Sequence, residues 1–192
     1  MKIITRDDLK VLKSELMDKI RNGSVFIHPT DTIYGIGCNA LNEAAVKKIR
    51  DLKGRPDTPF SVIAPGKEWI REHCKSASPA LLDEWLEKLP GPYTLILKTN
   101  KSSVVAKETN KGMGTLGVRI PNHWFSSLVE EADVPVITTS ANKVGNDFMT
   151  SLDDLDSEIK QHIDFILYEG EKIGRPSKLV NLSVPKTEII ER

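Results

Sequence analysis

The chain has 192 residues, 39% of them hydrophobic, and its 27 basic side chains balance its 27 acidic ones. A chain of this length can bury a substantial core, so we expect a single domain over residues 1–192. The zero net charge excludes the bulk basic excess that drives non-specific binding to nucleic acid or to an anionic membrane.

The two cysteines, Cys38 and Cys74, have no metal-binding or redox spacing, and a chain of this size does not need a disulfide. The N-terminus lacks the apolar segment of a signal peptide, and no run approaches the ~20 apolar residues of a membrane span. We therefore expect reduced cysteines, a cytoplasmic location and no membrane contact.

The N-terminal part of the chain alternates between helix and strand patterns. Apolar residues at helical spacing predict a first helix that Thr5 caps and Gly23 follows. Ser24–Ile27 is a short apolar strand pattern that leads into His28–Gly37, a segment rich in threonine and glycine. We interpret His28–Gly37 as a binding loop that leaves the strand.

A second predicted helix begins at Asn42 and ends at Lys53-Gly54-Arg55-Pro56, where glycine and proline stop it. Lys53 and Arg55 suit an anionic ligand, because arginine is a bidentate fork and lysine a mobile point charge. Cations at a helix exit also complement the helix dipole, so the pair alone does not establish a site.

Short apolar strand patterns recur along the rest of the chain, at Phe60–Ala64, Tyr93–Lys98, Thr115–Ile120, Pro135–Thr138, Ile163–Leu167, Leu179–Val184 and Glu188–Ile190. Helical patterns lie between some of them, at Ser78–Lys88, Trp124–Val129 and Leu152–Gln161. Tyr93–Lys98 and Thr115–Ile120 have no helical pattern between them, which favours mixed strand directions. We predict an α/β fold with one twisted, open, mixed sheet and flanking helices.

Arg119 interrupts the apolar pattern of its strand. A charge there is costly to bury unless it has an anionic partner. That partner is either a ligand or an aspartate or glutamate of the protein, and the residues leave both open.

Two further polar clusters follow strands, where ligands bind in open sheets. In the first, Thr30, Asp31, Thr32 and Tyr34 offer hydroxyls and a carboxylate beside glycines. The second holds Ser140 and Asn142. Each cluster is equally compatible with a hydrogen-bonded turn.

Several standard sites are absent from the sequence: the GxxxxGK[ST] and GxGxxG phosphate loops, the GxSxG elbow and any histidine pair with metal-ligand spacing. We therefore expect no metal ion held by the protein alone.

Five motifs, taken in order, resemble the YrdC-like family: His28–Gly37, Lys53–Pro56, Pro90–Thr94, Val118–Pro121 and Thr139–Asn142. The resemblance extends from about Lys10 to the C-terminus and implies a sheet with a concave, positively charged ligand face. It also implies the activity of an L-threonylcarbamoyladenylate synthase, a nucleotidyltransferase. Such enzymes make threonylcarbamoyl-AMP and pyrophosphate from L-threonine, bicarbonate or CO2, and ATP, for modification of the tRNA adenosine next to the anticodon. Longer members carry an extra C-terminal domain, which we do not expect here.

The resemblance also implies roles for individual residues. Those expected to bind threonine are Thr32, Tyr34, Arg119, Thr138 and Ser177. Those expected to bind ATP are Lys53, Arg55, Pro59, Thr115, Ser140, Asn142 and Arg192. Lys53 and Arg55 would also be the catalytic residues, Mg²⁺ would accompany ATP, and a tRNA threonylcarbamoyl-transferase would take the product.

Three positions depart from the family pattern. Ala64 and Val144 stand where many members have histidine and serine, and Lys178 replaces a threonine. Two other functions stay open: carbamoyl transfer through carbamoyl-adenylate without threonine, and RNA or ribosome binding without turnover.

Overall fold

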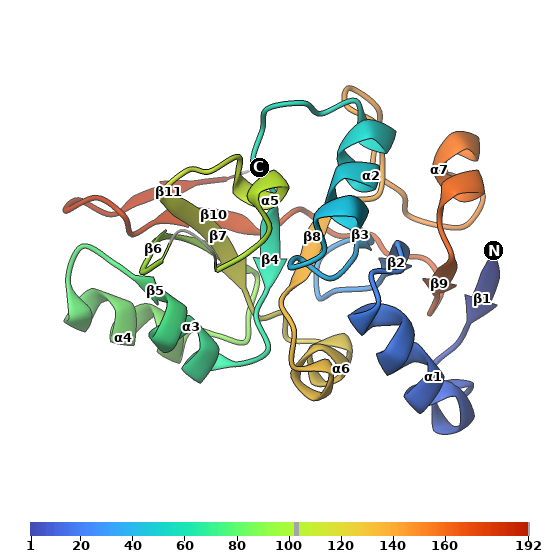
Figure 1. Cartoon of the computed structure of the whole chain (residues 1–192), viewed down its shortest axis with the longest axis horizontal. Coiled ribbons are helices and arrows are strands. Elements are labelled where there is room, and N and C mark those ends of the chain that lie inside the picture. Colours follow the sequence, from blue (N-terminus) through green and yellow to red (C-terminus); the bar gives the residue numbers. More distant parts are fainter. Residues whose placement is uncertain (102–103, 192) are drawn as a thin grey trace.

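One mixed β-sheet runs through the computed structural model, which describes residues 1–101 and 104–191 (Figure 1). Its strands are β1 (Lys2–Ile4), β2 (Phe26–His28), β3 (Gly35–Gly37), β4 (Ser61–Ile63), β5 (Cys74–Lys75), β6 (Tyr93–Thr99), β7 (Thr115–Arg119), β8 (Val136–Ser140), β9 (Phe165–Leu167), β10 (Lys178–Asn181) and β11 (Glu188–Ile190). The helices are α1 (Leu9–Arg21), α2 (Glu43–Lys53), α3 (Lys67–His73), α4 (Pro79–Glu87), α5 (Lys107–Asn110), α6 (Phe125–Ala132) and α7 (Ser157–His162).

The strand order is β1-β9-β2-β3-β8-β4-β7-β6-β10-β11, with β5 added on β6. Parallel pairs such as β4–β7 and β6–β10 alternate with antiparallel pairs such as β3–β8 and β6–β7. The predicted mixed α/β sheet is confirmed.

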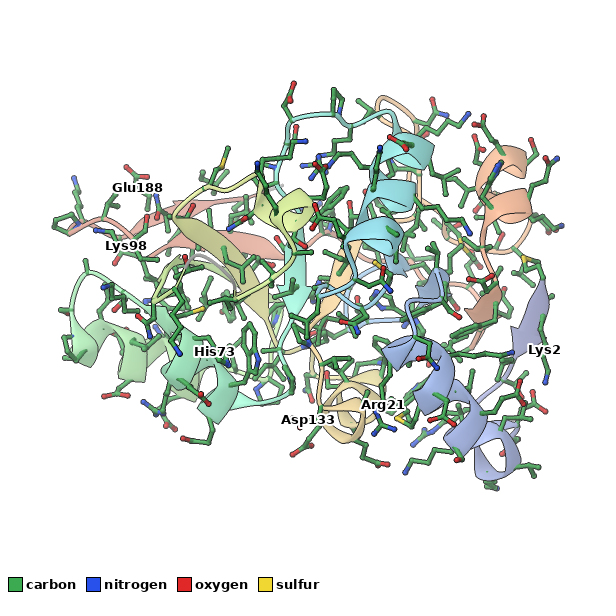
Figure 2. All side chains as sticks on the ribbon, in the orientation of Figure 1. Lys2, Arg21, His73, Lys98, Asp133 and Glu188 are labelled. Carbon is green, nitrogen blue, oxygen red and sulfur yellow. The ribbon has the colours of Figure 1, made fainter. Side chains whose placement is uncertain are left out.

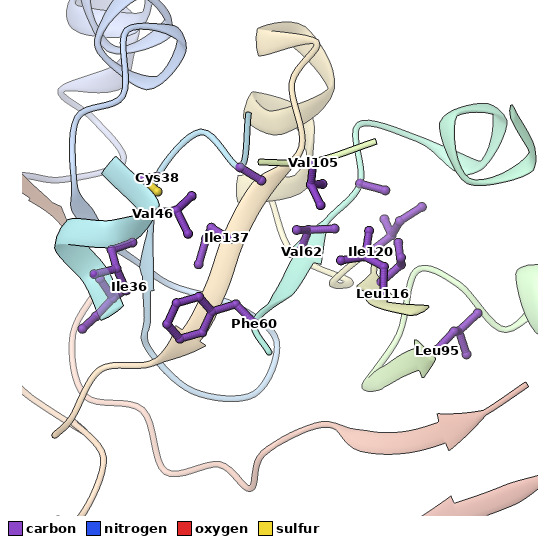
Figure 3. Packing of buried hydrophobic residues seen from close by; sticks show 14 of the residues in the cluster. Ile36, Cys38, Val46, Phe60, Val62, Leu95, Val105, Leu116, Ile120 and Ile137 are labelled. Atoms are coloured by element: carbon purple, nitrogen blue, oxygen red, sulfur yellow. The ribbon is translucent and has the colours of Figure 1, made fainter. Parts of the chain in front are cut away.

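Two clusters of buried hydrophobic residues lie on opposite faces of the sheet, because side chains alternate along each strand. The face with Phe26 and Ile63 packs against α1 and α6, which lie below the sheet in Figure 1. The face with Val62 and Ile137 packs against α2, as Figure 3 shows for Val46, and the same cluster takes in α3, α4 and α7.

Beyond α6, the face of the sheet that carries Ile63 becomes polar. Ser61 pairs with Gly117 on one side and with Thr138 on the other, so these three residues share that face. The change from apolar side chains to hydroxyls and glycine leaves room for a ligand on this face of the sheet.

Local signals explain why α2 lies where the sequence predicts it. The Asn42 side chain accepts a hydrogen bond from the amide of Ala45 at 3.0 Å, and Gly54 ends the helix with φ +60°. Lys53 is therefore the last helical residue, and Arg55 begins the segment that returns to β4.

The predicted binding loop at His28–Gly37 needs correction. His28 is the last residue of β2 and pairs with Gly35 of β3, so only residues 29–34 form the turn between the two strands. β3 escaped prediction because its two glycines resemble a loop, whereas they let the His28 ring pack against the strand: a Cβ on Gly35 would lie 2.9 Å from that ring.

Other predicted boundaries also differ. Thr5 does not cap α1; instead its amide and hydroxyl donate to Asp8, and the helix begins at Leu9. The last helix begins at Ser157, because Asp154 ties the preceding residues into a turn through the amide of Ser151. The connection between β6 and β7 contains the short helix α5.

None of the helices in the described part of the chain combines the length and apolar character that crossing a bilayer requires.

Candidate active site

A cavity of about 250 Å³ opens where β3, β4, β7 and β8 meet the segments that follow or precede them. Its lining includes seven of the residues predicted to bind substrates: Tyr34, Arg55, Pro59, Arg119, Thr138, Ser140 and Ser177. Side chains from both predicted substrate sets therefore share one cavity.

Thr30 builds the turn at one wall of this cavity. Its hydroxyl accepts hydrogen bonds from the amides of Thr32 and Ile33 at 3.1 and 3.2 Å, and it donates to the Ile33 carbonyl at 2.8 Å. The Thr32 hydroxyl lies 2.9 Å from that of Thr30. Thr32 is thus held at the edge of the cavity, next to a lining residue.

Arg119 has an acidic partner within the protein. Its Nη2 donates to Asp31 Oδ1 at 2.6 Å, and both Nη atoms lie 3.4 Å from Thr32 Oγ1. Asp31 Oδ2 also accepts from the amide of Asn122 at 3.0 Å. Of the two partners that the sequence left open, the internal carboxylate is present, and it joins the turn at 29–34 to the end of β7.

Tyr34 holds the segment 168–177 against the site. Its hydroxyl donates to the Gly170 carbonyl at 2.6 Å and accepts from the Glu169 amide at 3.1 Å. Burial raises the pKa of Tyr34 to about 12, so the phenol stays neutral. Gly174 packs so closely on Thr32 that a Cβ there would lie 2.0 Å from the Thr32 carbonyl oxygen.

Glu169 ties the same segment to the residues immediately before α6. Its carboxylate lies 2.8 Å from His123 Nε2, 2.6 Å from Trp124 Nε1 and 2.5 Å from Lys172 Nζ. Burial raises the pKa of Glu169, but the hydrogen bonds from these neighbours outweigh it, and the net pKa is lowered. Glu169 carries no signal in the sequence, because His123 and Trp124 lie 46 and 45 positions away along the chain.

Lys53 points into the turn that contains Ser140 and Asn142. Its ammonium donates to the carbonyls of Ser140 and Asn142 at 2.6 and 2.5 Å, and it lies 3.2 Å from Asn142 Oδ1. Burial lowers the pKa of Lys53 to about 7, and the charge of Arg55 adds to this effect. Lys53 therefore organises this turn.

A second hollow, of about 350 Å³, adjoins the cavity and shares Arg55 and Ser140 with it. Its lining consists of Lys53, Arg55, Thr58, Ser140, Asn142 and Val144. The Ser140 hydroxyl donates to Asn142 Oδ1 at 2.5 Å, so a hydrogen bond joins the two side chains at this hollow. The predicted Lys53–Arg55 and Ser140–Asn142 pairs are thus neighbours.

Two residues predicted to bind ATP do not join this group. Thr115 begins β7, at the opposite end of the strand from Arg119, and it is not among the residues that line the cavity. Arg192 lies outside the described residues. At the three departures from the family pattern, Ala64 is buried, Val144 is exposed at the second hollow, and Lys178 pairs with Glu191.

The lining also contains residues that the sequence analysis did not assign. The Thr94 hydroxyl lies 2.7 Å from that of Ser177, which links β6 to the segment before β10. Phe60 immediately precedes β4, and the guanidinium carbon of Arg55 lies 5.7 Å from the centroid of its ring. Thr94 lies in one of the five family motifs, but a single hydroxyl in a strand pattern does not indicate a binding residue.

His28 does not take part in the site. It is fully buried and stacks on Phe125 at 4.4 Å, and burial lowers its pKa to about 3. The described residues contain no cluster of three or more histidine, cysteine, aspartate or glutamate side chains able to hold a metal ion.

Comparison with known proteins is decisive for the family. The family model Sua5_yciO_yrdC, described as "Telomere recombination", matches residues 18–192. The chain belongs to the Sua5–YciO–YrdC family.

Among curated members, a Pyrococcus abyssi protein named "Threonylcarbamoyl-AMP synthase" is 36% identical over 169 residues, which are 85% of this chain and 48% of that protein. A Methanocaldococcus jannaschii protein, to which its name assigns the same activity provisionally, is 32% identical over 189 residues, 95% of this chain and 86% of that protein. The chain thus spans about half the length of the P. abyssi relative.

Solved structures of Sua5–YciO–YrdC proteins share the fold. A structure described as "P. abyssi Sua5 complexed with L-threonine" superposes with a TM-score of 0.86 at 29% identity, covering 98% of this chain and 56% of that one. Escherichia coli YciO superposes with a TM-score of 0.82 at 20% identity, covering 100% of this chain and 94% of that one. The second likeness concerns the fold alone.

Proposed function

We propose that this chain is an L-threonylcarbamoyladenylate synthase, which converts L-threonine, bicarbonate or CO2, and ATP into threonylcarbamoyl-AMP and pyrophosphate. The observation that carries the proposal is the single cavity lined both by Arg119 and Thr138, expected at threonine, and by Arg55 and Ser140, expected at ATP. Curated relatives that bear this name, and a relative crystallised with L-threonine, support the substrate class.

In this proposal, Arg119 and Thr32 bind the threonine carboxylate. A guanidinium carries five N–H donors, so its pairing with Asp31 is compatible with a contact to a second carboxylate. Ser177 and Thr138 line the same cavity as Arg119. Pro176 and Ser177, at the end of the segment 168–177 that Tyr34 holds, form part of the cavity wall.

Arg55 and the turn at Ser140–Asn142 bind the phosphates of ATP. Lys53 fixes that turn from behind it, through the carbonyls of Ser140 and Asn142. Such groups catalyse by positioning the reactants and by neutralising charge that builds on the phosphate oxygens.

The chemistry needs no covalent enzyme intermediate. The neutral amine of threonine adds to CO2 and loses a proton to solvent, which gives a carbamate. A carbamate oxygen then attacks the α-phosphorus of ATP while pyrophosphate leaves. Phosphoryl and nucleotidyl transfers of this kind depend on alignment of the attacking and leaving oxygens.

Mg²⁺ is proposed to arrive with ATP. The described residues offer no protein cluster that fits a resident metal ion, so the phosphates would supply its ligands, and the ion would neutralise charge on them. The transfer of the product to a tRNA-modifying partner, any direct RNA contact and a cytoplasmic location stay predictions.

The test is to incubate the chain with ATP, Mg²⁺, bicarbonate and L-threonine and to identify the adenylate by chromatography and mass spectrometry. We expect Lys53→Ala and Arg55→Ala to reduce its formation by orders of magnitude while the fold persists, with roughly 100-fold as the lower limit for loss of a preorganised charge. Lys48, which is exposed on α2, supplies the control variant Lys48→Ala. Near-normal product formation by Arg55→Ala would contradict the assignment.

A further inference from the structure

Arg50 is a buried cation of α2 that the proposed chemistry does not use. Only 4% of it is exposed, and its Nη1 donates to the backbone carbonyls of Arg55, Pro56 and Thr58 at 2.6, 3.2 and 3.0 Å. One guanidinium nitrogen thus contacts three carbonyls of the segment that joins α2 to β4. This segment carries Arg55 and Pro59, which both line the cavity.

The other side of the Arg50 guanidinium is fixed to α5. Nη2 donates to the Glu108 carbonyl, and Nε lies 3.1 Å from Glu108 Oε2. Glu108 is itself held, because its amide donates to Glu43 Oε1 at 3.1 Å and its carboxylate pairs with Lys111 at 3.0 Å. Arg50 therefore fastens the 55–58 backbone to two helices rather than to one flexible neighbour.

Phe60 completes the arrangement. Its ring lies under the Arg50 guanidinium at 4.5 Å and near that of Arg55 at 5.7 Å, so one ring contacts both cations. The Phe60 amide donates to the Thr109 carbonyl of α5 at 2.8 Å. The start of β4 is thereby fixed to the same helix as Arg50.

We infer that Arg50 is a positioning residue for the ATP half of the site: it holds the 55–58 backbone, and through it Arg55 and Pro59, in the place where they face the cavity. This inference rests on the proposed function. A lysine cannot replace Arg50, because an ammonium is a point charge without the planar set of donors that serves several carbonyls at once. A purely structural ion pair with Glu108 would predict instead that any cation suffices.

The test compares Arg50→Lys with a matched control, Arg21→Lys. Arg21 also donates its guanidinium to backbone carbonyls, those of Ala132 and Glu131 at 3.2 and 3.0 Å, but it lies at the end of α1 beside α6. Figure 2 shows Arg21 next to Asp133, whereas the segment that follows α2 runs along the opposite edge of the molecule in Figure 1. A third variant, Glu108→Gln, removes the acidic partner and leaves the carbonyl contacts.

For Arg50→Lys, we expect ATP affinity, measured by titration calorimetry, to fall about tenfold or more, as loss of hydrogen bonds to a charged group implies. The KM for ATP should rise accordingly, while the KM for threonine stays within about twofold. Hydrogen exchange should accelerate at the amides of Arg55 and Phe60, which donate to the carbonyls of Arg50 and Thr109. Arg21→Lys and Glu108→Gln should bind ATP as the unchanged chain does.

Unchanged ATP affinity in Arg50→Lys would overturn the inference, and so would an equal loss for ATP and threonine. An equal loss of ATP affinity in Arg21→Lys would also overturn it, because the effect would then reflect general stability. A chain that binds ATP but forms no adenylate would contradict the proposed function alone, since the affinity measurement needs no turnover.

Discussion

Arg119 and Asp31 form a buried ion pair at the edge of the cavity, where the two side chains are 6% and 12% exposed. The sequence could predict that Arg119 needs an anionic partner, but not which one, because Asp31 lies 88 positions away along the chain. Only the packing of β7 beside the turn at 29–34 brings them together. The pair raises the question of whether Arg119 serves binding, stability or both.

A double-mutant comparison separates the two roles. Arg119→Gln should lower the free energy of unfolding by about 3 kcal/mol, because it leaves Asp31 buried without its partner. Adding Asp31→Asn should restore much of that stability, but threonine affinity should stay at least about tenfold weaker than in the unchanged chain. Urea unfolding and titration calorimetry measure the two quantities. Recovery of threonine binding in the double variant would show that Arg119 acts through stability alone.

Lys53 gives a prediction for pH. Burial lowers its pKa from 10.5 to about 7, so between these values the unfolded chain holds a proton that the folded chain releases. Lys53 therefore makes a contribution to the free energy of unfolding that increases with pH in this window. The free energy of unfolding of the unchanged chain should rise more steeply from about pH 7 to about pH 10 than that of Lys53→Met.

Urea unfolding at several pH values checks this expectation, and Lys48→Met, on the exposed side of the same helix, is the control. Parallel pH profiles for Lys53→Met and the unchanged chain would contradict the lowered pKa.

At the scale of elements, α2 and the segment 168–177 contribute the two sides of the site. α2 could be predicted from Asn42, Gly54 and its apolar spacing, and its end was placed correctly because capping is a local property. The segment 168–177 could not be placed from its sequence, since its position depends on the contacts of Tyr34 and Glu169 with parts of the chain far away. β3 was missed for a different reason, because its two glycines, Gly35 and Gly37, resemble a loop.

The contact between the segment 168–177 and the threonine side of the site can be tested at Gly174. Gly174→Ala would bring a methyl group to 2.0 Å from the Thr32 carbonyl, so the segment must move away from the turn at 29–34. We expect threonine affinity to fall about tenfold and ATP affinity to stay nearly unchanged. Titration calorimetry with each substrate measures both.

Gly114→Ala is the matched control, because a Cβ there meets nothing within 4 Å. If Gly174→Ala bound threonine as tightly as this control does, the segment 168–177 would have no part in the threonine site.

At the scale of the whole molecule, one half of the sheet is packed between helices and the other half borders the cavity. The half near β9 and β2 is covered on both faces by helices, whereas the strands β4 and β8 present Ser61 and Thr138 to the cavity. The mixed sheet was predictable from the strand patterns, and the site residues from ordered motifs that resemble a family. What the sequence could not supply was which of these residues touch: Lys53 faces the turn at Ser140–Asn142, and Thr115 lies apart from the cavity.

The central claim is that one cavity joins threonine to ATP, and its most direct test is pyrophosphate release from ATP by the unchanged chain. With Mg²⁺ and bicarbonate present, L-threonine should start the release, and serine in its place should support it roughly tenfold less efficiently, because one methyl contact is lost. Omission of bicarbonate should stop it. Release that continues at the same rate without threonine, or none with all substrates present, would contradict the account.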